Sequence, residues 1–308
     1  MPLISVVIPC FNVADTVAET IASAQAQTIR DFEIVAVDNN STDATVSILN
    51  NIAGDDSRLR IVQQPVQGLS AARNAGIAAA RGRFIALLDA DDLWDWDYLA
   101  SHLENLSDRD NAISYSQVRL IDSEGRRTGL ITRPKTFGLG ATDFLRSNPC
   151  TSMSFVVVPR RVFAQVGMFN ESFRRAEDQE WFFRAALAGC EFRGIDRDLA
   201  SYRTSPGALS SDLDKMLCAH DQLLDVAETL APDLLAKERR LAHAAMLRYC
   251  ARRTLDHKKG VKAARGYTLR MLRVAPDLLL REPMQTLKAM IAVLAPGVLA
   301  WRVQNAVK

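Results

Sequence analysis

Three carboxylates stand close together in the segment RFIALLDADD. Asp89, Asp91 and Asp92 follow an apolar run typical of a buried strand, where the chain turns out of a sheet. Burying them without partners would cost free energy, so we expect them at an accessible edge. Carboxylate oxygens suit Mg²⁺ or Mn²⁺, and such an ion can bridge two phosphates and neutralise their charge. Alone the pattern is weak, because clustered acids also cap helices.

Alternating elements are expected to position these acids. Short apolar runs at 4–9, 33–37, 59–63 and 84–88 are separated by stretches with helical spacing. This order predicts a mostly parallel sheet covered by helices, which binds ligands at the carboxyl ends of its strands. Asp38 and Asp89 both stand at such ends.

The helical stretches have apolar faces, and the second one has candidate capping residues in Ser41 and Thr42. The first face consists of Val17, Ile21 and Ala24, the second of Val46, Leu49 and Ala53, and the third stretch, 70–80, is rich in Ala.

The chain changes character twice after the first sheet pattern. From about residue 110, strand-like runs at 112–121 and 152–158 precede a predicted helix at 177–188. Beyond about residue 214 the spacing is helical, with breaks at prolines. We therefore expect a domain at 1–214 and a helical region at 215–308. The string APDLL, which starts at Ala231 and again at Ala275, is interpreted as a helix boundary. The breaks fall at Pro232, Pro276, Pro283 and Pro296.

Charge is distributed unevenly along the chain. From Lys237 onward there are 16 Lys and Arg against 4 Asp and Glu, whereas the preceding residues carry 22 against 32. The acidic first part would repel nucleic acid, so an anionic membrane surface is the expected partner of the basic helices. Solvated helix faces are the alternative. The apolar stretch 289–301 spans roughly 20 Å as a helix, too short for a bilayer core of roughly 30 Å.

Cysteine usage and the amino terminus indicate a cytoplasmic protein. The five cysteines are scattered and form no Cys-x-x-Cys pair, so neither a disulfide framework nor a zinc cluster is expected. The start, MPLISVVIPCFN, has no basic region or cleavage site of a secretory signal.

Four motifs carry a family resemblance: SVVIPCFN, AVDNNSTD, GLSAARNAGIAAARG and FIALLDADD, in this order. Over roughly residues 3 to 205 the chain resembles the family 2 glycosyltransferases of GT-A fold. The resemblance implies an α/β fold in which a mixed sheet has helices on both faces, with a C-terminal helical appendage. It also implies inverting transfer from an NDP-sugar, usually a UDP-sugar, to a glycan or lipid-linked acceptor in bacterial surface-polysaccharide synthesis.

The resemblance also implies roles for particular residues. On the donor side, Asp38 would bind the base, Phe11 would stack on it, Arg73 would reach the diphosphate, Asp89 would face the ribose and Asp91 would bind Mg²⁺ or Mn²⁺. Physical alternatives are an Asx turn of Asp38 with Ser41 and a core position for Phe11. The full set implied to bind the nucleotide-sugar is Pro9, Phe11, Asn12, Asp38, Arg73, Asp89, Ala90 and Arg203.

The acids of RRAEDQEWFFR resemble the family's catalytic pair, with Asp178 as the base and Glu177 orienting it. A helix amino terminus favours the ionised carboxylate, whereas adjacent Glu177 opposes it, and ordinary first-turn acids are the alternative. Trp181, in the same segment, is expected to pack in the core, and stacking on an acceptor sugar is the alternative. Ser205 occupies a position where many relatives carry a histidine, so the expected metal site depends on Asp91.

Two other functions remain open from the sequence. A sugar nucleotidyltransferase also pairs a parallel sheet with two carboxylates, but it needs a basic, glycine-rich first turn, and here that turn is PCFN. A non-catalytic nucleotide-sugar-binding module, recruited to a membrane by its basic tail, is the second alternative.

Overall fold

The computed structural model describes residues 1–107, 109–204, 212–256, 260–281, 286–287 and 290. The chain divides into two compact units. The first contains Met1–Ala141 and Asn148–Ser205, and the second contains Thr142–Ser147 and Pro206–Lys308. This division lies nine residues before the expected boundary at 214, and the expectation did not include the short segment of the second unit that interrupts the first.

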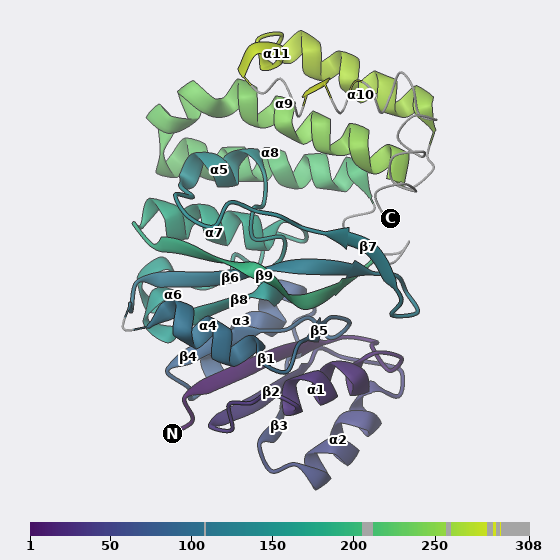
Figure 1. The fold of residues 1–308 in the computed structure, drawn as a ribbon, viewed down its shortest axis with the longest axis vertical. Helices are drawn as coiled ribbons and strands as arrows, with labels where there is room; N and C mark the ends of the chain where they lie inside the picture. Colours follow the sequence, from purple (N-terminus) through teal and green to yellow (C-terminus); the bar gives the residue numbers. More distant parts are fainter. Residues whose placement is uncertain (108, 205–211, 257–259, 282–285, 288–289, 291–308) are drawn as a thin grey trace. The chain divides into compact units, whose positions relative to one another are not determined.

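Four parallel strands form one half of the sheet in the first unit (Figure 1). Every residue of β1 and β2 is buried, which explains why these strands are continuous apolar runs. Cys10 pairs with Asp38, so the two strands end at the same edge. The predicted strands are confirmed to within a residue or two at each end. They are β1 (Ile4–Cys10), β2 (Phe32–Asp38), β3 (Leu59–Gln63) and β4 (Phe84–Leu87).

The other half of the sheet makes it mixed, as expected. The order is β3-β2-β1-β4-β8-β6-β9-β5, with β7 paired to β6. β8 runs antiparallel to β4 and β6, whereas β6 and β9 are parallel. The added strands are β5 (Leu93–Trp94), β6 (Ala112–Ile121), β7 (Arg127–Ile131), β8 (Val156–Pro159) and β9 (Glu191–Arg203).

One predicted strand was wrong at its start. Residues 153–155 form a short 3-10 helix, η1 (Met153–Phe155), and only then does β8 begin. Thr151 has a φ of 69°, and the Ser152 hydroxyl accepts the backbone N–H of Ser154. These two features turn the chain before it can enter the sheet.

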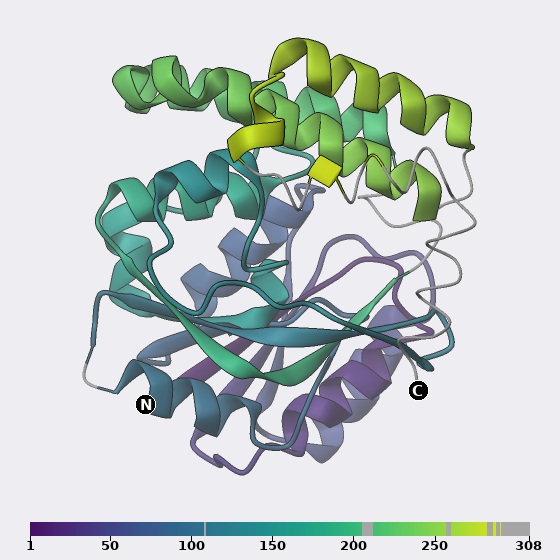
Figure 2. The same cartoon turned by 45° about the horizontal axis from the view of Figure 1, so that its top comes forward.

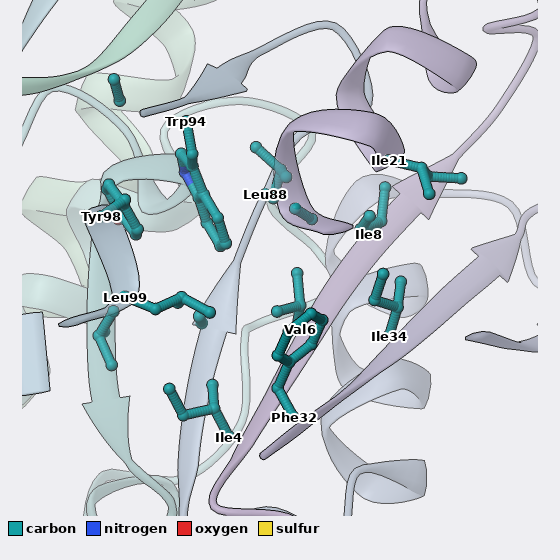
Figure 3. Packing of buried hydrophobic residues seen from close by; sticks show 14 of the residues in the cluster. Ile4, Val6, Ile8, Ile21, Phe32, Ile34, Leu88, Trp94, Tyr98 and Leu99 are labelled. Carbon is teal, nitrogen blue, oxygen red and sulfur yellow. The ribbon is translucent and has the colours of Figure 1, made fainter. Parts of the chain in front are cut away.

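Helices cover both faces of the sheet (Figure 2). α1 (Val17–Gln25), α2 (Thr45–Asp55) and α4 (Tyr98–Leu106) pack on one face, and α3 (Leu69–Ala79) and α7 (Glu177–Leu187) on the other. α6 (Arg160–Val166) contacts α7 and β8. Alternate residues of β1, namely Ile4, Val6 and Ile8, point into the cluster that includes Ile21 and Leu99 (Figure 3).

The predicted cap of α2 was wrong. The helix begins after Ala44, and neither Ser41 nor Thr42 caps it. Both residues instead contact Asn12, which donates its N–H to the Ser41 hydroxyl and accepts the N–H of Thr42. Their polar groups therefore join the loop after β1 to the loop after β2.

The second unit is helical in its described part, with boundaries at the predicted prolines. Pro232 opens α9, and Pro276 lies between α10 and α11, so both APDLL strings are confirmed as helix boundaries. Pro283, Pro296 and the stretch 289–301 lie outside the described residues. No helix in the described part is long and apolar enough to span a bilayer. The helices are α5 (Ala141–Arg146), α8 (Leu213–Leu230), α9 (Pro232–Asp256), α10 (Val261–Val274) and α11 (Leu278–Arg281).

We expect Gly76→Ala to destabilise the first unit by about 1–3 kcal/mol, because overpacking displaces neighbouring core atoms. A Cβ at this position would lie 2.2 Å from Val7 Cγ1 and 3.0 Å from Val37 Cγ2. Urea unfolding would measure the loss.

The matched control is Gly54→Ala, also in a helix, where nothing lies within 4 Å of an added Cβ. This variant should gain about 0.5–1 kcal/mol from the better helix propensity of alanine. Equal unfolding midpoints for the two variants would contradict the close packing of α3 on β1.

Candidate active site

The carboxyl ends of β1 and β2 form an open edge. Asp38 is buried there, and its Oδ1 accepts the N–H of Ser41 at 3.2 Å, so the Asx-type contact is present. Phe11 is 45% exposed, which excludes the core position that was the alternative for it. Asn12 has a φ of 52°, which turns the chain away from the sheet beside Phe11. This edge therefore presents an aromatic face close to a strand-end carboxylate.

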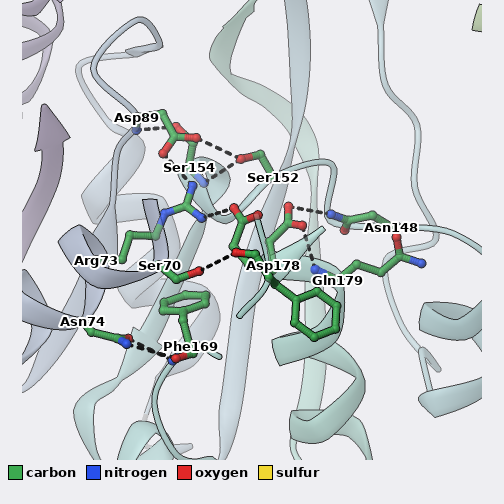
Figure 4. A network of polar contacts seen from close by, with 12 residues as sticks. Ser70, Arg73, Asn74, Asp89, Asn148, Ser152, Ser154, Phe169, Asp178 and Gln179 are labelled. Carbon is green, nitrogen blue, oxygen red and sulfur yellow. Dashed lines mark hydrogen bonds and ion pairs between the residues drawn. The ribbon is translucent and has the colours of Figure 1, made fainter. Parts of the chain in front are cut away.

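Arg73 lies at the centre of the polar network (Figure 4). Its side chain is 1% exposed, and its Nη1 donates to Glu177 Oε1 at 2.6 Å while Nη2 donates to Asp89 Oδ1 at 2.7 Å. The guanidinium carbon also lies 5.6 Å from the centre of the Phe169 ring. Burial opposes the charge, but Asp89 and Glu177 outweigh it and hold the pKa of Arg73 above its ordinary value.

Asp89 and Asp91 follow β4 in the turn that the sequence predicted. The Oδ2 of Asp89 accepts the Ser152 hydroxyl at 3.2 Å, and its N–H donates to the Ser154 hydroxyl at 3.0 Å. Asp91 is half-buried, and burial together with the charge of Asp89 raises its pKa to about 6. A carboxylate in this environment would be stabilised by a cation.

The Asp91 carboxylate supplies the hard oxygen ligands that suit a divalent ion such as Mg²⁺ or Mn²⁺. Within the described ranges, no group of three or more His, Cys, Asp or Glu side chains forms a ready metal cage. Mg²⁺ is commonly held by one or two carboxylates together with phosphates and waters, so the arrangement around Asp91 fits an ion delivered with a nucleotide.

Asp92 and Trp94 shape the turn from inside. Asp92 is fully buried, its Oδ1 accepts the N–H of Arg203 at 2.9 Å, and burial holds its pKa well above the ordinary value. The Trp94 indole N–H donates to the carbonyl of Ser154 at 3.1 Å, and its ring stacks on Tyr98 with centroids 4.2 Å apart. These contacts give both residues a structural role in the turn and the core.

Arg203, the last residue of β9, contacts the backbone of the same turn. Its Nε donates to the carbonyl oxygen of Asp91 at 2.8 Å, Nη2 to Glu19 at 2.8 Å and Nη1 to the carbonyl of Ser123 at 3.3 Å. In this structure the guanidinium holds the backbone of the turn, so it would have to exchange one of these contacts to bind a phosphate. Ser205 lies outside the described residues.

Asp178 lies in the first turn of α7, next to Glu177. Its Oδ1 accepts the N–H of Gln179 at 2.7 Å, and its Oδ2 accepts the side-chain N–H of Asn148 at 2.8 Å. Burial and the charge of Glu177 raise the pKa of Asp178 to about 7, against the opposing effect of Arg73. This carboxyl group can therefore exchange a proton near neutral pH.

Arg73 brings together the acids predicted to bind the donor and the acids predicted to be catalytic. It bridges Asp89, in the turn after β4, and Glu177, which is next to Asp178. Trp181 packs in the core as expected, fully buried, with its indole N–H on the carbonyl of Gly167. Among the described residues, Asp38 forms no hydrogen bond or ion pair with this network, and it lies at the carboxyl end of β2, two strands away from β4.

Sequence reasoning missed three polar residues of the site: Asn148, Ser152 and Ser154. They lie in the segment NPCTSMS, which was interpreted in part as a strand. The available signal was the group of small polar residues, Thr151, Ser152 and Ser154, shortly before the apolar run FVVV. Their functional contacts join positions 30 to 65 residues apart, which local patterns do not reveal.

Residues 5–199 match the family described as Glycosyl transferase family 2. The chondroitin synthase of Pasteurella multocida is 31% identical over 201 residues, which are 64% of this chain and 20% of that protein. The chain therefore spans only about a fifth of the length of this curated relative.

A second relative matches over most of its own length. It is the Escherichia coli protein named UDP-Glc:alpha-D-GlcNAc-diphosphoundecaprenol beta-1,3-glucosyltransferase WfaP, 27% identical over 227 residues, which are 73% of this chain and 86% of that protein. Among solved structures, S. aureus TarS 1–349 in complex with UDP-GlcNAc superposes with a TM-score of 0.57 at 15% identity. The match covers 95% of this chain and 90% of that one and shows a shared fold.

We expect Arg73→Leu to destabilise the protein by about 3–5 kcal/mol, because it leaves two largely buried carboxylates without their counter-ion. Equilibrium urea unfolding would measure the change.

Arg83→Leu is the control, since its ion pair with Asp110 is exposed, with side chains 57% and 39% accessible. Its cost should stay below about 1 kcal/mol. A similar small cost for Arg73→Leu would show that the buried bridge does not hold the site together.

Proposed function

Because the chain belongs to glycosyl transferase family 2, we propose that it transfers a sugar from an NDP-sugar, preferentially a UDP-sugar, to an acceptor hydroxyl with inversion. The fold is of the GT-A type, as the match to TarS shows. The observation that carries the proposal is the Arg73 bridge between Asp89 and Glu177, because it sets a donor-side carboxylate beside a base with a pKa near neutrality.

The donor half of the proposal rests on the edge formed after β1, β2 and β4. The exposed ring of Phe11 can stack on a base, and the buried Asp38 can accept an imide N–H. Asp89 can accept ribose hydroxyls while its other contacts keep it oriented. A crystal structure of TarS holds UDP-GlcNAc, which supports a UDP-sugar in a fold of this kind.

Asp91 is proposed to hold Mg²⁺ or Mn²⁺. When bound, such an ion would neutralise the charge of the departing nucleoside diphosphate. The chain itself holds the backbone at Asp91, because Arg203 Nε donates to the Asp91 carbonyl oxygen and the carboxylate of the next residue, Asp92, accepts the N–H of Arg203 in β9. The remaining coordination positions of the ion would be filled by phosphate oxygens and waters.

Asp178 is proposed to act as the general base. Its carboxylate takes the proton of the acceptor hydroxyl as that oxygen forms a bond to the anomeric carbon, and the bond from this carbon to the diphosphate oxygen breaks. Attack from the side opposite the leaving group inverts the anomeric centre. Asn148 and the N–H of Gln179 orient the two carboxylate oxygens, while Glu177 is held by Arg73.

The proposed acceptor is a glycan or a lipid-linked sugar in bacterial surface-polysaccharide synthesis, on the cytoplasmic side of the membrane. The name of WfaP includes a diphosphoundecaprenol acceptor, which supports this class. The basic C-terminal helices are proposed to bind an anionic membrane surface. On α10 the exposed basic side chains are Lys262, Arg265, Arg270 and Arg273.

We expect Asp178→Asn to lower kcat by about 10²- to 10⁴-fold, because it removes the proton acceptor while the amide preserves the shape. Binding of the donor, measured by thermal shift, should persist. Since the ionised carboxylate is the active form, the wild-type rate should fall as pH drops below about 7.

Asn148→Ala provides the comparison. It removes an N–H that stabilises the ionised Asp178, so the acid limb of the pH–rate profile should move to higher pH. An unmoved limb, or full activity in Asp178→Asn, would refute the assignment of the base. Nucleotide-sugar binding without transfer in the wild type would favour the non-catalytic module.

The metal can be tested by a panel of nucleotide sugars in thermal-shift assays with and without Mn²⁺. A ligand at about 100 times its Kd stabilises the native state by about 2.7 kcal/mol. Asp91→Asn should lose the part of this stabilisation that depends on Mn²⁺ and keep the remainder. Glu104→Gln, an exposed acid outside the turn, should behave as the wild type. An unchanged Mn²⁺ effect in Asp91→Asn would exclude this carboxylate as the ligand.

A further inference from the structure

The β6–β7 hairpin stands out in the first unit by its exposure. Every residue of β7 is exposed, although a strand in a packed sheet normally buries at least one face. β7 pairs with β6 through Arg119 with Ile131 and Ile121 with Arg127 (Figure 1). Both faces of this strand are therefore available to a partner.

Large apolar side chains gather on this exposed segment. Leu130 is 51% exposed, Ile131 is 40% exposed and Phe137 is 80% exposed. Single exposed apolar residues are normal on a protein surface, but three within eight positions form a patch that favours contact with apolar matter. We call the exposed residues of 126–137 the hairpin surface.

The hairpin surface is also basic. Residues 126–137 contain four basic residues and no acid, although the chain before Lys237 carries an excess of Asp and Glu. Arg126 pairs with Asp122 and Glu124, and Arg127 and Arg133 are exposed beside the apolar side chains. Positive charge and apolar area thus coincide on one segment of an otherwise acidic unit.

We propose that the hairpin surface docks the catalytic unit on an anionic phospholipid membrane. Basic side chains near such a surface contribute about 1 kcal/mol each, and large apolar side chains gain further by entering the boundary between headgroups and acyl chains. A nucleic acid would use the charges and leave Leu130 and Ile131 in water. An apolar peptide would leave Arg127 and Arg133 without counter-charges.

The hairpin surface is connected to the site through one side chain. Ile121, at the end of β6, pairs with Arg203 of β9. The Nη1 of Arg203 donates to the carbonyl oxygen of Ser123, in the turn between β6 and β7. The same arginine donates to the carbonyl of Asp91. A membrane bound at the hairpin would lie next to the carboxylate turn, which suits a lipid-linked acceptor. The role in presenting a lipid-linked acceptor rests on the proposed function, whereas the membrane contact itself does not.

The test is flotation of the full chain with phosphatidylcholine vesicles that contain about three parts in ten phosphatidylglycerol, compared with phosphatidylcholine alone. The wild type should bind the anionic vesicles preferentially. The double variant Arg127→Glu/Arg133→Glu should lower the partition coefficient at least about tenfold. The triple variant Leu130→Ser/Ile131→Ser/Phe137→Ser should lower it about as much.

Matched controls change the same kinds of exposed residue elsewhere in the first unit. They are Arg30→Glu/Arg81→Glu for charge and Trp96→Ser/Met168→Ser for apolar area. Both should float with the anionic vesicles as the wild type does. Circular dichroism and thermal unfolding should show that all four variants are folded.

Several outcomes would overturn the docking proposal. Hairpin variants that float like the wild type would show that the C-terminal helices alone bind the membrane. Equal binding to neutral vesicles would remove the role of charge, and binding to heparin without flotation would indicate an acidic macromolecule. Since flotation needs no donor, an inactive chain that still shows the hairpin effect would refute the proposed function and leave the docking surface standing.

Discussion

A guanidinium with 1% of its side-chain surface exposed must be neutralised by the protein around it, and Arg73 meets this condition through Asp89 and Glu177. The three groups come from α3, from the turn after β4 and from the start of α7. Ser152 and Ser154 also hold Asp89, and the Arg73 guanidinium lies over the Phe169 ring, so displacement of one group would disturb the others. This charge balance couples the parallel half of the sheet to the helix that carries Asp178.

The acids around this bridge outnumber the buried cations. Burial and mutual repulsion raise the pKa of Asp91 to about 6 and that of Asp178 to about 7, so both carboxyl groups are poised to gain a positive partner. At Asp178 the proposed partner is a proton, and at Asp91 it is a divalent ion. The same excess of negative charge would repel a free diphosphate, which gives the proposed ion a second use in binding.

The predictable parts of the fold are those whose periodicity comes from burial. β1 and β2 are buried at every position, and α1 presents Val17, Ile21 and Ala24 to the core, so their patterns are plain in the sequence. β9 was missed because its middle carries Asp196, Arg197 and Asp198, which lie in a polar, partly exposed stretch. The residues of the site also differ in whether the sequence alone predicts them. Asp89 and Asp178 stand in recognisable motifs, whereas Asn148, Ser152 and Ser154 act through contacts that only the folded chain creates.

The course of the chain between Ala141 and Asn148 bears on how the two units can evolve. The chain leaves the first unit for Thr142–Ser147, where Arg146 pairs with Glu238 at 2.9 Å, and then returns directly to Asn148, which holds Asp178. The first unit is therefore discontinuous in sequence, and the helical unit is not a simple appendage that recombination could exchange at one junction. A grafted helical region would have to accept the α5 segment as well, so we expect the two units to be inherited together.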